Sequence, residues 1–159
     1  MEFLLGEKHS SIFFGKESQP LRADRFKVRL ASDVILPCPW DRNRTTSALA
    51  NIGTGKKSGP WKEDVNHFLT LWLPWEIAFV NGGNHSITAG IIDGEGEIIP
   101  RYVYDMSGIL DCVDCDGRFY RRRETGKAIT KVTKPRIAAV FEIGRLINAA
   151  FARSKDRIL

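Results

Sequence analysis

The sequence predicts a mixed fold, α/β or α+β, in which helices pack on a small mixed β-sheet. Three segments carry this prediction. Residues 77–80 form a short apolar run of strand length that ends at paired glycines. Residues 25–30 alternate apolar and basic side chains, as a half-buried strand does. Residues 135–153 repeat apolar side chains at helical spacing, which is typical of a helix packed on a sheet.

The bulk properties favour a single domain over residues 1–159, and 43% apolar residues are enough for a packed core. The 24 Lys and Arg residues outnumber the 19 Asp and Glu residues, for a formal charge of +5. This bias suits nucleic acid, nucleotide or anionic lipid partners. No apolar run approaches the roughly 20 residues of a membrane span, and the start is unlike a signal peptide. We therefore expect a reduced, cytoplasmic protein.

The first third of the chain is expected to be mostly extended. Residues 1–20 are read as an N-terminal arm with a short strand near residues 11–14. Prolines keep residues 34–40 extended. A short helix is then expected from Thr45 or Thr46, either of which can cap it, to Asn51.

Two arginines precede this expected helix. Arg42 and Arg44 flank Asn43, and guanidinium groups bind oxyanions through two parallel hydrogen bonds. The pair is therefore a candidate phosphate clamp. The alternative is a solvated loop tip.

A glycine-rich loop with two lysines, Lys56 and Lys57, follows at residues 53–61. It does not match a P-loop, because position 50 is Ala50 and a lysine stands where Ser or Thr is required. A basic loop that touches phosphate remains a reasonable interpretation, since backbone N–H groups can form an anion-binding nest.

The central motif follows the apolar run at residues 77–80. Gly82 and Gly83 permit positive φ and leave no side chain in the way of a ligand. A helix that begins near Ser86 would point its first N–H groups at that space, which suits an anion. Asn84 and His85 lie at the same place, and histidine can transfer protons near neutral pH. The alternative is a hairpin turn with a structural histidine.

The second half of the chain alternates strands and turns before its last helix. Residues 68–73 predict a strand that ends at Pro74, and residues 98–104 predict a strand limited by Pro100. Pro135 suits the first turn of a C-terminal helix that runs to about residue 153.

Cys112 and Cys115 form an isolated CxxC pair, which suits redox chemistry or half of a metal site. A zinc site needs two further ligands, and neither Cys38 nor any histidine has the spacing of a known motif. We therefore expect neither a zinc site nor a structural disulfide here.

The densest positive patch follows as a basic edge strand. Basic and aromatic side chains interleave there, which suits single-stranded nucleic acid. The alternative is an edge strand guarded by charge against aggregation. The patch contains Arg118, Arg121, Arg122 and Arg123.

The order of features over residues 34–92 resembles the ParB/sulfiredoxin superfamily. In that family an arginine precedes a small helix, of the type seen here as SALANIG. A strand then leads to a Gly-x-His-Arg or Gly-x-Arg-Arg element that holds nucleotide phosphate at a helix start. The matching element here is Gly83-Asn84-His85-Ser86, so Ser86 replaces the second basic residue.

Within the superfamily, the chain length and the sequence NGGNHS look most like plasmid fertility-inhibition proteins of the oncogenic-suppression type. Those proteins block transfer of DNA, or of its protein escort, through a type IV secretion system. The resemblance implies ATP hydrolysis and DNA cleavage, with ATP and Mg²⁺ as cofactors. The alternative is a non-enzymatic inhibitor that binds a component of the transfer machinery. The location would be the cytoplasm or the inner-membrane surface.

The residues and the resemblance together define three sets of candidates. The catalytic set is His85, Asn84 and Arg42. The nucleotide-binding set is Gly82, Gly83, Ser86, Arg44, Lys56 and Lys57, and we expect its cations to face the same cleft as His85. The DNA-binding set is the four arginines of the positive patch. No metal ligands are assigned.

Overall fold

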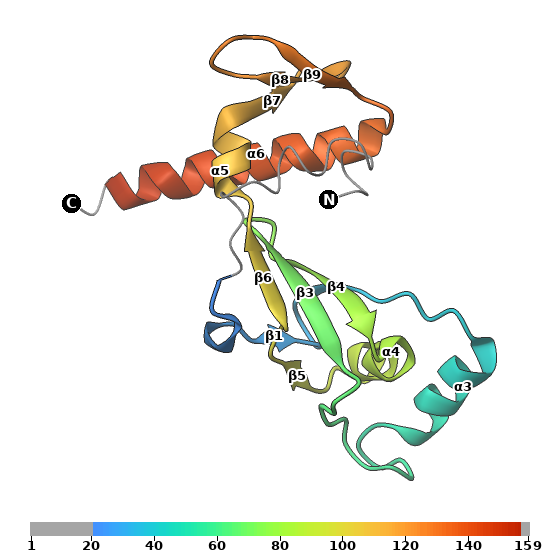
Figure 1. The fold of residues 1–159 in the computed structure, drawn as a ribbon. Coiled ribbons are helices and arrows are strands. Elements are labelled where there is room, and N and C mark those ends of the chain that lie inside the picture. Colours follow the sequence, from blue (N-terminus) through green and yellow to red (C-terminus); the bar gives the residue numbers. More distant parts are fainter. Residues whose placement is uncertain (1–20, 157–159) are drawn as a thin grey trace. The chain divides into compact units, whose positions relative to one another are not determined.

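The computed structural model describes residues 21–156, so the predicted arm at residues 1–20 and its strand lie outside the described residues. The fold is a mixture of helices and small β-sheets, as predicted (Figure 1). The described residues group into two compact units. We call them the N-terminal unit, up to Tyr104, and the C-terminal unit, from Asp105 onward. This grouping does not test the predicted single domain, which stays a prediction.

The N-terminal unit is built on a four-stranded sheet with strand order β2–β4–β3–β6. These strands are β2 (Val34–Leu36), β4 (Ile77–Gly82), β3 (Phe68–Leu73) and β6 (Tyr102–Asp105). Strand β2 runs parallel to β4, whereas β3 runs antiparallel to it. The sheet is therefore mixed, as the sequence predicts.

The strand predicted at residues 25–30 is shorter than expected. A 3-10 turn, η1 (Ala23–Arg25), precedes it, and only β1 (Val28–Arg29) pairs, antiparallel with β5 (Glu97–Ile98). The Asp33 carboxylate accepts a hydrogen bond from the Arg29 N–H at 2.8 Å and thereby turns the chain after this residue. The side chain of Asp33, which lies beyond the alternating segment, thus sets the end of strand β1.

The strand predicted at residues 98–104 is divided in two. Strand β5 ends at Ile98, and β6 begins at Tyr102. Pro100 is buried between them and has no N–H to donate to a sheet, which accounts for the break.

Helix α3 (Arg42–Asn51) begins earlier than predicted. Its N-cap is Asp41, whose Oδ1 accepts a hydrogen bond from the Arg44 N–H at 2.8 Å. The two threonines expected to cap the helix lie inside it. The Thr45 hydroxyl donates back to the Asp41 carbonyl oxygen, and that of Thr46 donates back to the Arg42 carbonyl oxygen. A carboxylate at the boundary is a strong N-cap, so it places the start of the helix.

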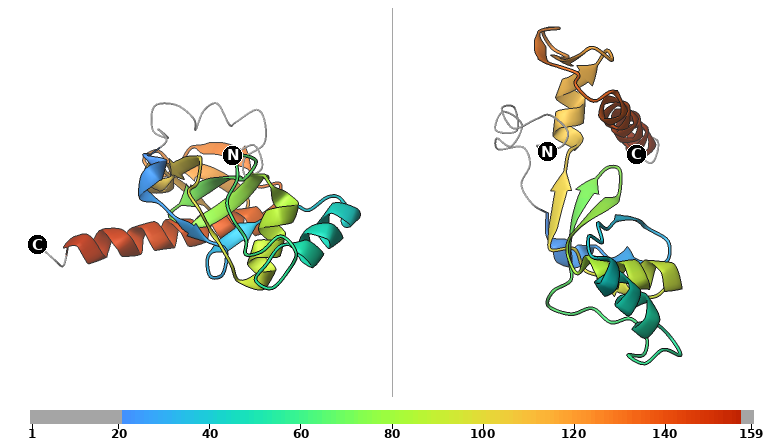
Figure 2. Two further views of the ribbon diagram at one scale, coloured as in Figure 1. Left: turned by 90° about the horizontal axis from the view of Figure 1, so that it is seen from below. Right: turned by 90° about the vertical axis from the view of Figure 1, so that its right-hand side faces the viewer.

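Helix α4 (Asn84–Asp93) starts directly after the paired glycines, two residues before the predicted start near Ser86. It lies beside α3 (Figure 2), and the contact between Thr45 and His85 shows that the two helices begin at the same end. Thr45 in the first turn of α3 contacts His85 in the first turn of α4. Beyond the other end of α3, Lys56 bonds to both the Leu49 carbonyl oxygen and Asp93 of α4. The helices therefore run in the same direction.

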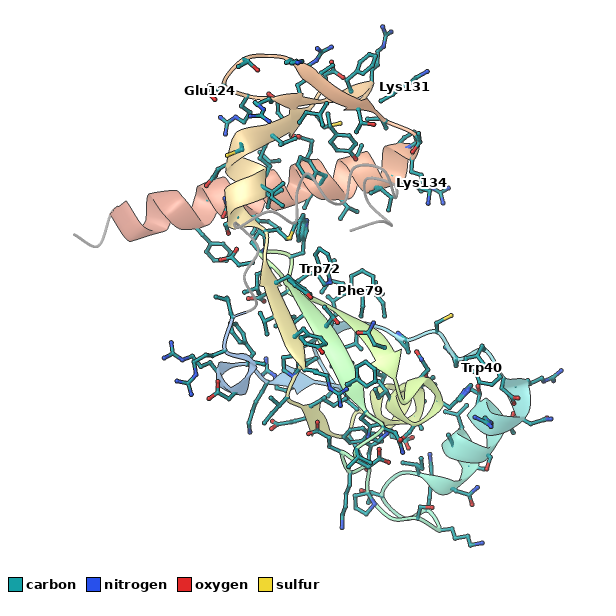
Figure 3. The ribbon with its side chains drawn as sticks, in the orientation of Figure 1. Trp40, Trp72, Phe79, Glu124, Lys131 and Lys134 are labelled. Carbon is teal, nitrogen blue, oxygen red and sulfur yellow. The ribbon has the colours of Figure 1, made fainter. Side chains whose placement is uncertain are left out.

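The core of the N-terminal unit is made by one sheet face, α4 and the glycine-rich loop. It contains the buried residues Val28, Leu30, Trp61, Leu69, Leu71, Ala78, Ile87, Ile98 and Val103. Aromatic rings occupy the opposite sheet face, where Trp72 and Phe79 meet edge to face at 6.3 Å between centroids (Figure 3).

The C-terminal unit combines a three-stranded antiparallel sheet with two helices. Its elements are α5 (Ser107–Cys112), β7 (Val113–Cys115), β8 (Phe119–Arg122), β9 (Ala128–Lys131) and α6 (Pro135–Asp156). Helix α6 begins at Pro135, as predicted, and packs on the sheet through edge-to-face contact between Phe141 and Tyr120. None of the described helices is both long enough and apolar enough to cross a membrane.

The sequence predicted the basic strand β8 as an edge strand. In the structure it is the middle strand of this sheet. The turn at Asp116 and Gly117 pairs it with β7, and a second turn at Gly126 pairs it with β9. No strand was predicted after Arg123, so the second partner was not expected.

Gly83 occupies a position that no other residue fits without strain. Its φ is 76°, in the left-handed region that L-residues rarely adopt. A Cβ added there would also overlap the His67 ring. Gly55 in the glycine-rich loop has a similar φ of 79°, but open space surrounds it.

We expect Gly83→Ala to lower the free energy of unfolding by about 2–4 kcal/mol, because backbone strain and steric overlap add. Gly55→Ala is the matched control and should cost about 1–2 kcal/mol, since it carries the backbone strain alone. Urea unfolding of both variants measures the difference. Equal losses would show that the His67 ring does not restrict position 83.

Candidate functional site

The candidate site lies where α3 and α4 begin side by side. The first N–H groups of a helix have no partner within the helix, and the helix dipole places partial positive charge there. Gly83, the N-cap of α4, offers no side chain to these groups. The start of α4 therefore favours an anion, whereas the start of α3 is already capped by the Asp41 carboxylate.

His85 stands between these helix starts with a defined ring orientation. Its Nδ1 lies 3.0 Å from the Thr45 hydroxyl oxygen, and that hydroxyl already donates its one hydrogen to the Asp41 carbonyl oxygen at 2.7 Å. With that hydrogen on the Asp41 carbonyl oxygen, the Nδ1–H tautomer of His85 donates to Thr45. In the neutral ring this leaves the lone pair on Nε2, which is the nitrogen able to accept a proton.

The Nε2 atom of His85 is buried and has no hydrogen-bond partner among the described residues. Buried polar atoms are usually paired, so an orphaned ring nitrogen at a helix start is notable. A water molecule or substrate reaches Nε2 only after a neighbouring side chain moves. The His85 ring as a whole is half-buried, not enclosed.

Trp40 is the neighbouring ring, and sequence reasoning missed it. Its centroid lies 5.4 Å from that of His85, with the planes at 62°. The Arg44 guanidinium lies over the indole at 5.3 Å, and 70% of Trp40 is exposed. Figure 3 labels Trp40 beside the start of α3. The signal available in the sequence was a large aromatic residue directly before an N-cap.

Asn84 ties the extended segment before α3 to the start of α4. Its Oδ1 accepts a hydrogen bond from the Cys38 N–H at 2.7 Å. The predicted catalytic residue Asn84 therefore holds the backbone of the site through its side-chain oxygen.

Ser86 is positioned by the core. Its carbonyl oxygen and its hydroxyl oxygen accept hydrogen bonds from the Trp61 indole N–H at 2.9 and 3.1 Å. The Ser86 hydroxyl keeps its own hydrogen for donation.

The predicted cations separate into two groups. Arg42 and Arg44 lie in the first turn of α3, at the same end as His85. Lys56 bonds to Asp93 and the Leu49 carbonyl oxygen, and Asp93 lies eight residues beyond His85 along α4, which is about 12 Å. The structure thus brings the arginines to the helix starts and holds Lys56, with its neighbour Lys57, at the opposite end.

His67 supports the glycine turn from beneath. It is buried, stacks on Trp61 at 4.8 Å between centroids, and accepts a hydrogen bond from the Asp64 N–H through Nδ1. Burial lowers the pKa of His67, and this effect outweighs the carboxylates of Asp64 and Glu63, which raise it. A neutral His67 ring therefore packs against Gly83.

Within residues 21–156, no three His, Cys, Asp or Glu side chains gather as a metal site. Cys38, Cys112 and Cys115 are free thiols, and burial raises the pKa of Cys115. The donors at the helix starts are N–H groups and guanidinium groups, which bind anions and not cations. They fit a nucleotide phosphate, and a Mg²⁺ ion there would depend on phosphate oxygens for its ligands.

The four arginines predicted to bind DNA have different roles in the C-terminal unit. The Arg121 side chain bonds to Asp116 at 2.8 Å and to the Gly126 carbonyl oxygen, and Arg123 donates to the Asp111 carbonyl oxygen. The Phe119 N–H, the Arg121 guanidinium and the Arg118 N–H lower the pKa of Asp116 to about 2.

By contrast, Arg118 and Arg122 are exposed, and their side chains make no ion pair or hydrogen bond with the described residues. Within the predicted DNA-binding set they are the cations that remain available to phosphate.

A cavity of about 380 Å³ lies elsewhere in the N-terminal unit, between the β1–β2 turn and the β3–β4 turn. Its polar lining includes Lys27, Asp33 and Glu76. No predicted site residue lines it.

Comparison with known proteins gave one family match. Residues 3–153 match a family described as "Family of unknown function (DUF6710)". No curated protein and no solved structure matched the chain.

We expect the free energy of unfolding to fall as the pH drops below about 6.5, the ordinary pKa of histidine. The unfolded chain then binds a proton at His67 that the folded chain, with its lowered pKa, does not bind. The contribution of His67 cannot exceed about 1.4 kcal/mol per pH unit. Urea unfolding between pH 7.5 and 5.5 measures it. His67→Asn should flatten the slope, whereas the exposed control Val65→Ala should not. An unchanged slope in His67→Asn would contradict this assignment.

Proposed function

The chain belongs to the family of unknown function DUF6710, and we propose that it binds nucleotide phosphate at the paired helix starts of its N-terminal unit. The observation that carries this proposal is the joint start of α3 and α4 around His85. The wider proposal is a ParB/sulfiredoxin-type ATPase and DNase that inhibits conjugative or T-DNA transfer. The resemblance of residues 34–92 to that superfamily supports this wider role.

Phosphate binding follows from the donors at this place. The N–H groups of Asn84, His85 and Ser86 lie in the first turn of α4, where they have no partner within the helix. Arg44 has no acidic partner among the described residues, so its guanidinium can pair with a phosphate oxygen. Arg42 begins the same helix and is exposed.

Hydrolysis would use His85 as the proton-transfer group. Thr45 fixes the ring so that Nε2 carries the lone pair, and Nε2 can take a proton from an attacking water once it is uncovered. The helix N–H groups and Arg44 would stabilise charge that develops on the phosphoryl oxygens. When bound with ATP, Mg²⁺ supplies charge neutralisation on the same oxygens.

DNA would be held by backbone phosphates at Arg118 and Arg122 of the C-terminal unit. Both guanidinium groups are exposed and unpaired within the described residues. Contacts of this kind position a nucleic acid without reading its sequence. Arg118 and Arg122 would therefore impose no sequence preference on DNA cleavage.

A second candidate is a non-enzymatic inhibitor that binds a component of the type IV secretion machinery or a transferred protein. Two observations favour it. Nε2 of His85 is buried, and Ser86 stands where the family element has a second basic residue. A chain with these features can keep the fold and the binding surface after losing the chemistry.

His85→Ala separates the two candidates. If His85 transfers the proton, ATPase and DNase rates should fall about 100-fold or more, the usual contribution of general acid–base catalysis. Thr46→Ala is the control, because its exposed hydroxyl bonds only to the Arg42 carbonyl oxygen. If His85→Ala leaves both rates and transfer inhibition at the wild-type level, the histidine is structural and the binding inhibitor replaces the enzyme.

Replacing both Arg118 and Arg122 with Ala should weaken DNA binding. The slope of log K against log salt should become shallower by about 2, because each lost phosphate contact releases one counterion fewer. Fluorescence anisotropy over a salt series measures the slope. Arg121→Ala is the comparison: a free guanidinium would change the slope by about 1, and this variant should change it by less, since Asp116 already neutralises that guanidinium. Equal effects of all these arginines would contradict the assignment.

A further inference from the structure

We propose that Trp40 is the stacking surface for a nucleobase, so that the site takes an unpaired nucleotide and not phosphate alone. This inference rests on the proposed phosphate site and adds the base to it. The ligand is an aromatic base joined to its own phosphate. A free nucleotide and an unpaired nucleotide in a nucleic acid strand share this chemistry.

The exposure of Trp40 is the first observation. Tryptophan is usually well buried, and the other three tryptophans of the chain are buried or half-buried. Trp40 is 70% exposed, and its ring adjoins His85 at the start of α4, which has no capping side chain and favours an anion. Most of the indole surface is thus open to a planar ligand.

The indole is held in place before any ligand arrives. Asp41, the next residue, is fixed as the N-cap of α3. Arg44 lies one helical turn further on with its guanidinium 5.3 Å from the ring centroid, and the His85 ring lies 5.4 Å away. A ring that is already oriented loses little freedom when a base stacks on it.

The positive groups beside the Trp40 ring would bind the phosphate of the nucleotide. Arg44 touches Trp40 and has no acidic partner among the described residues. A base on the indole would carry its phosphate toward this guanidinium and the first N–H groups of α4. An apolar ligand would need only the ring, and a free phosphate would need only the cations and N–H groups. Their juxtaposition points to a ligand with both parts.

Stacking on Trp40 requires an open base face. Bases in a duplex are stacked on each other, whereas single strands offer their faces to aromatic side chains. The site should therefore distinguish single-stranded from duplex nucleic acid.

The test compares four probes by calorimetric titration on the full chain: ATP, inorganic tripolyphosphate, a short single-stranded oligothymidylate and the same sequence in a duplex. Trp40→Ala should weaken binding of ATP or of the single strand by about 5- to 150-fold, the range that base stacking gives. Tripolyphosphate binding should stay the same. Trp40→Phe should lie between the two, and Val65→Ala, which changes another exposed apolar residue, should match the wild type.

The probes also separate the ways in which the inference can fail. If wild type binds tripolyphosphate and Trp40→Ala binds ATP and the single strand as tightly as wild type does, base stacking is wrong and the phosphate site stands. If wild type binds none of the four probes, both proposals fail. An effect on ATP alone identifies a free nucleotide as the ligand, and an effect on the oligonucleotide identifies a strand.

Discussion

The N-terminal unit depends on the packing of one indole, that of Trp61. Its ring lies against Gly90 and Gly96, where a Cβ would collide with it, and it stacks on His67. Its N–H donates to Ser86 in the first turn of α4. The Trp61 side chain therefore joins the glycine-rich loop to the start of β3 and to both ends of α4.

Glu95 completes this arrangement from the other side of the loop. Its carboxylate accepts hydrogen bonds from the Thr54 N–H at 2.9 Å and the Trp61 N–H at 3.1 Å. The Thr54 side chain, followed by these two N–H groups, lowers the pKa of Glu95. The loop that resembles a phosphate-binding loop in composition is thus occupied with internal bonds. Its first glycine, Gly53, allows the close approach of Asp93, and its first lysine joins α3 to α4.

Sequence patterns predicted the elements that depend on residues close together in the chain. The strand, glycine turn and helix from Ile77 to Asp93 follow from β-formers and a residue without a side chain, and α6 follows from helical spacing. The pairing of Lys56 with Asp93 joins residues 37 positions apart, so no pattern within a window shows it. The same holds for the meeting of Thr45 with His85, 40 positions apart, which sets the orientation of the imidazole. Trp40 escaped notice because an exposed aromatic residue has no periodicity.

The two ties between α3 and α4 have a mechanical consequence. Thr45 and His85 join the helices at their starts, and Lys56 and Asp93 join them at their far ends. Two helices joined near both ends resist both splaying and sliding, so we expect the pair to move as one body. The extended chain that leads into α3 is held to this helix pair by the hydrogen bond from the Cys38 N–H to Asn84. Only two residues lie between Cys38 and the N-cap Asp41. The Trp40 indole can therefore move over only a short distance.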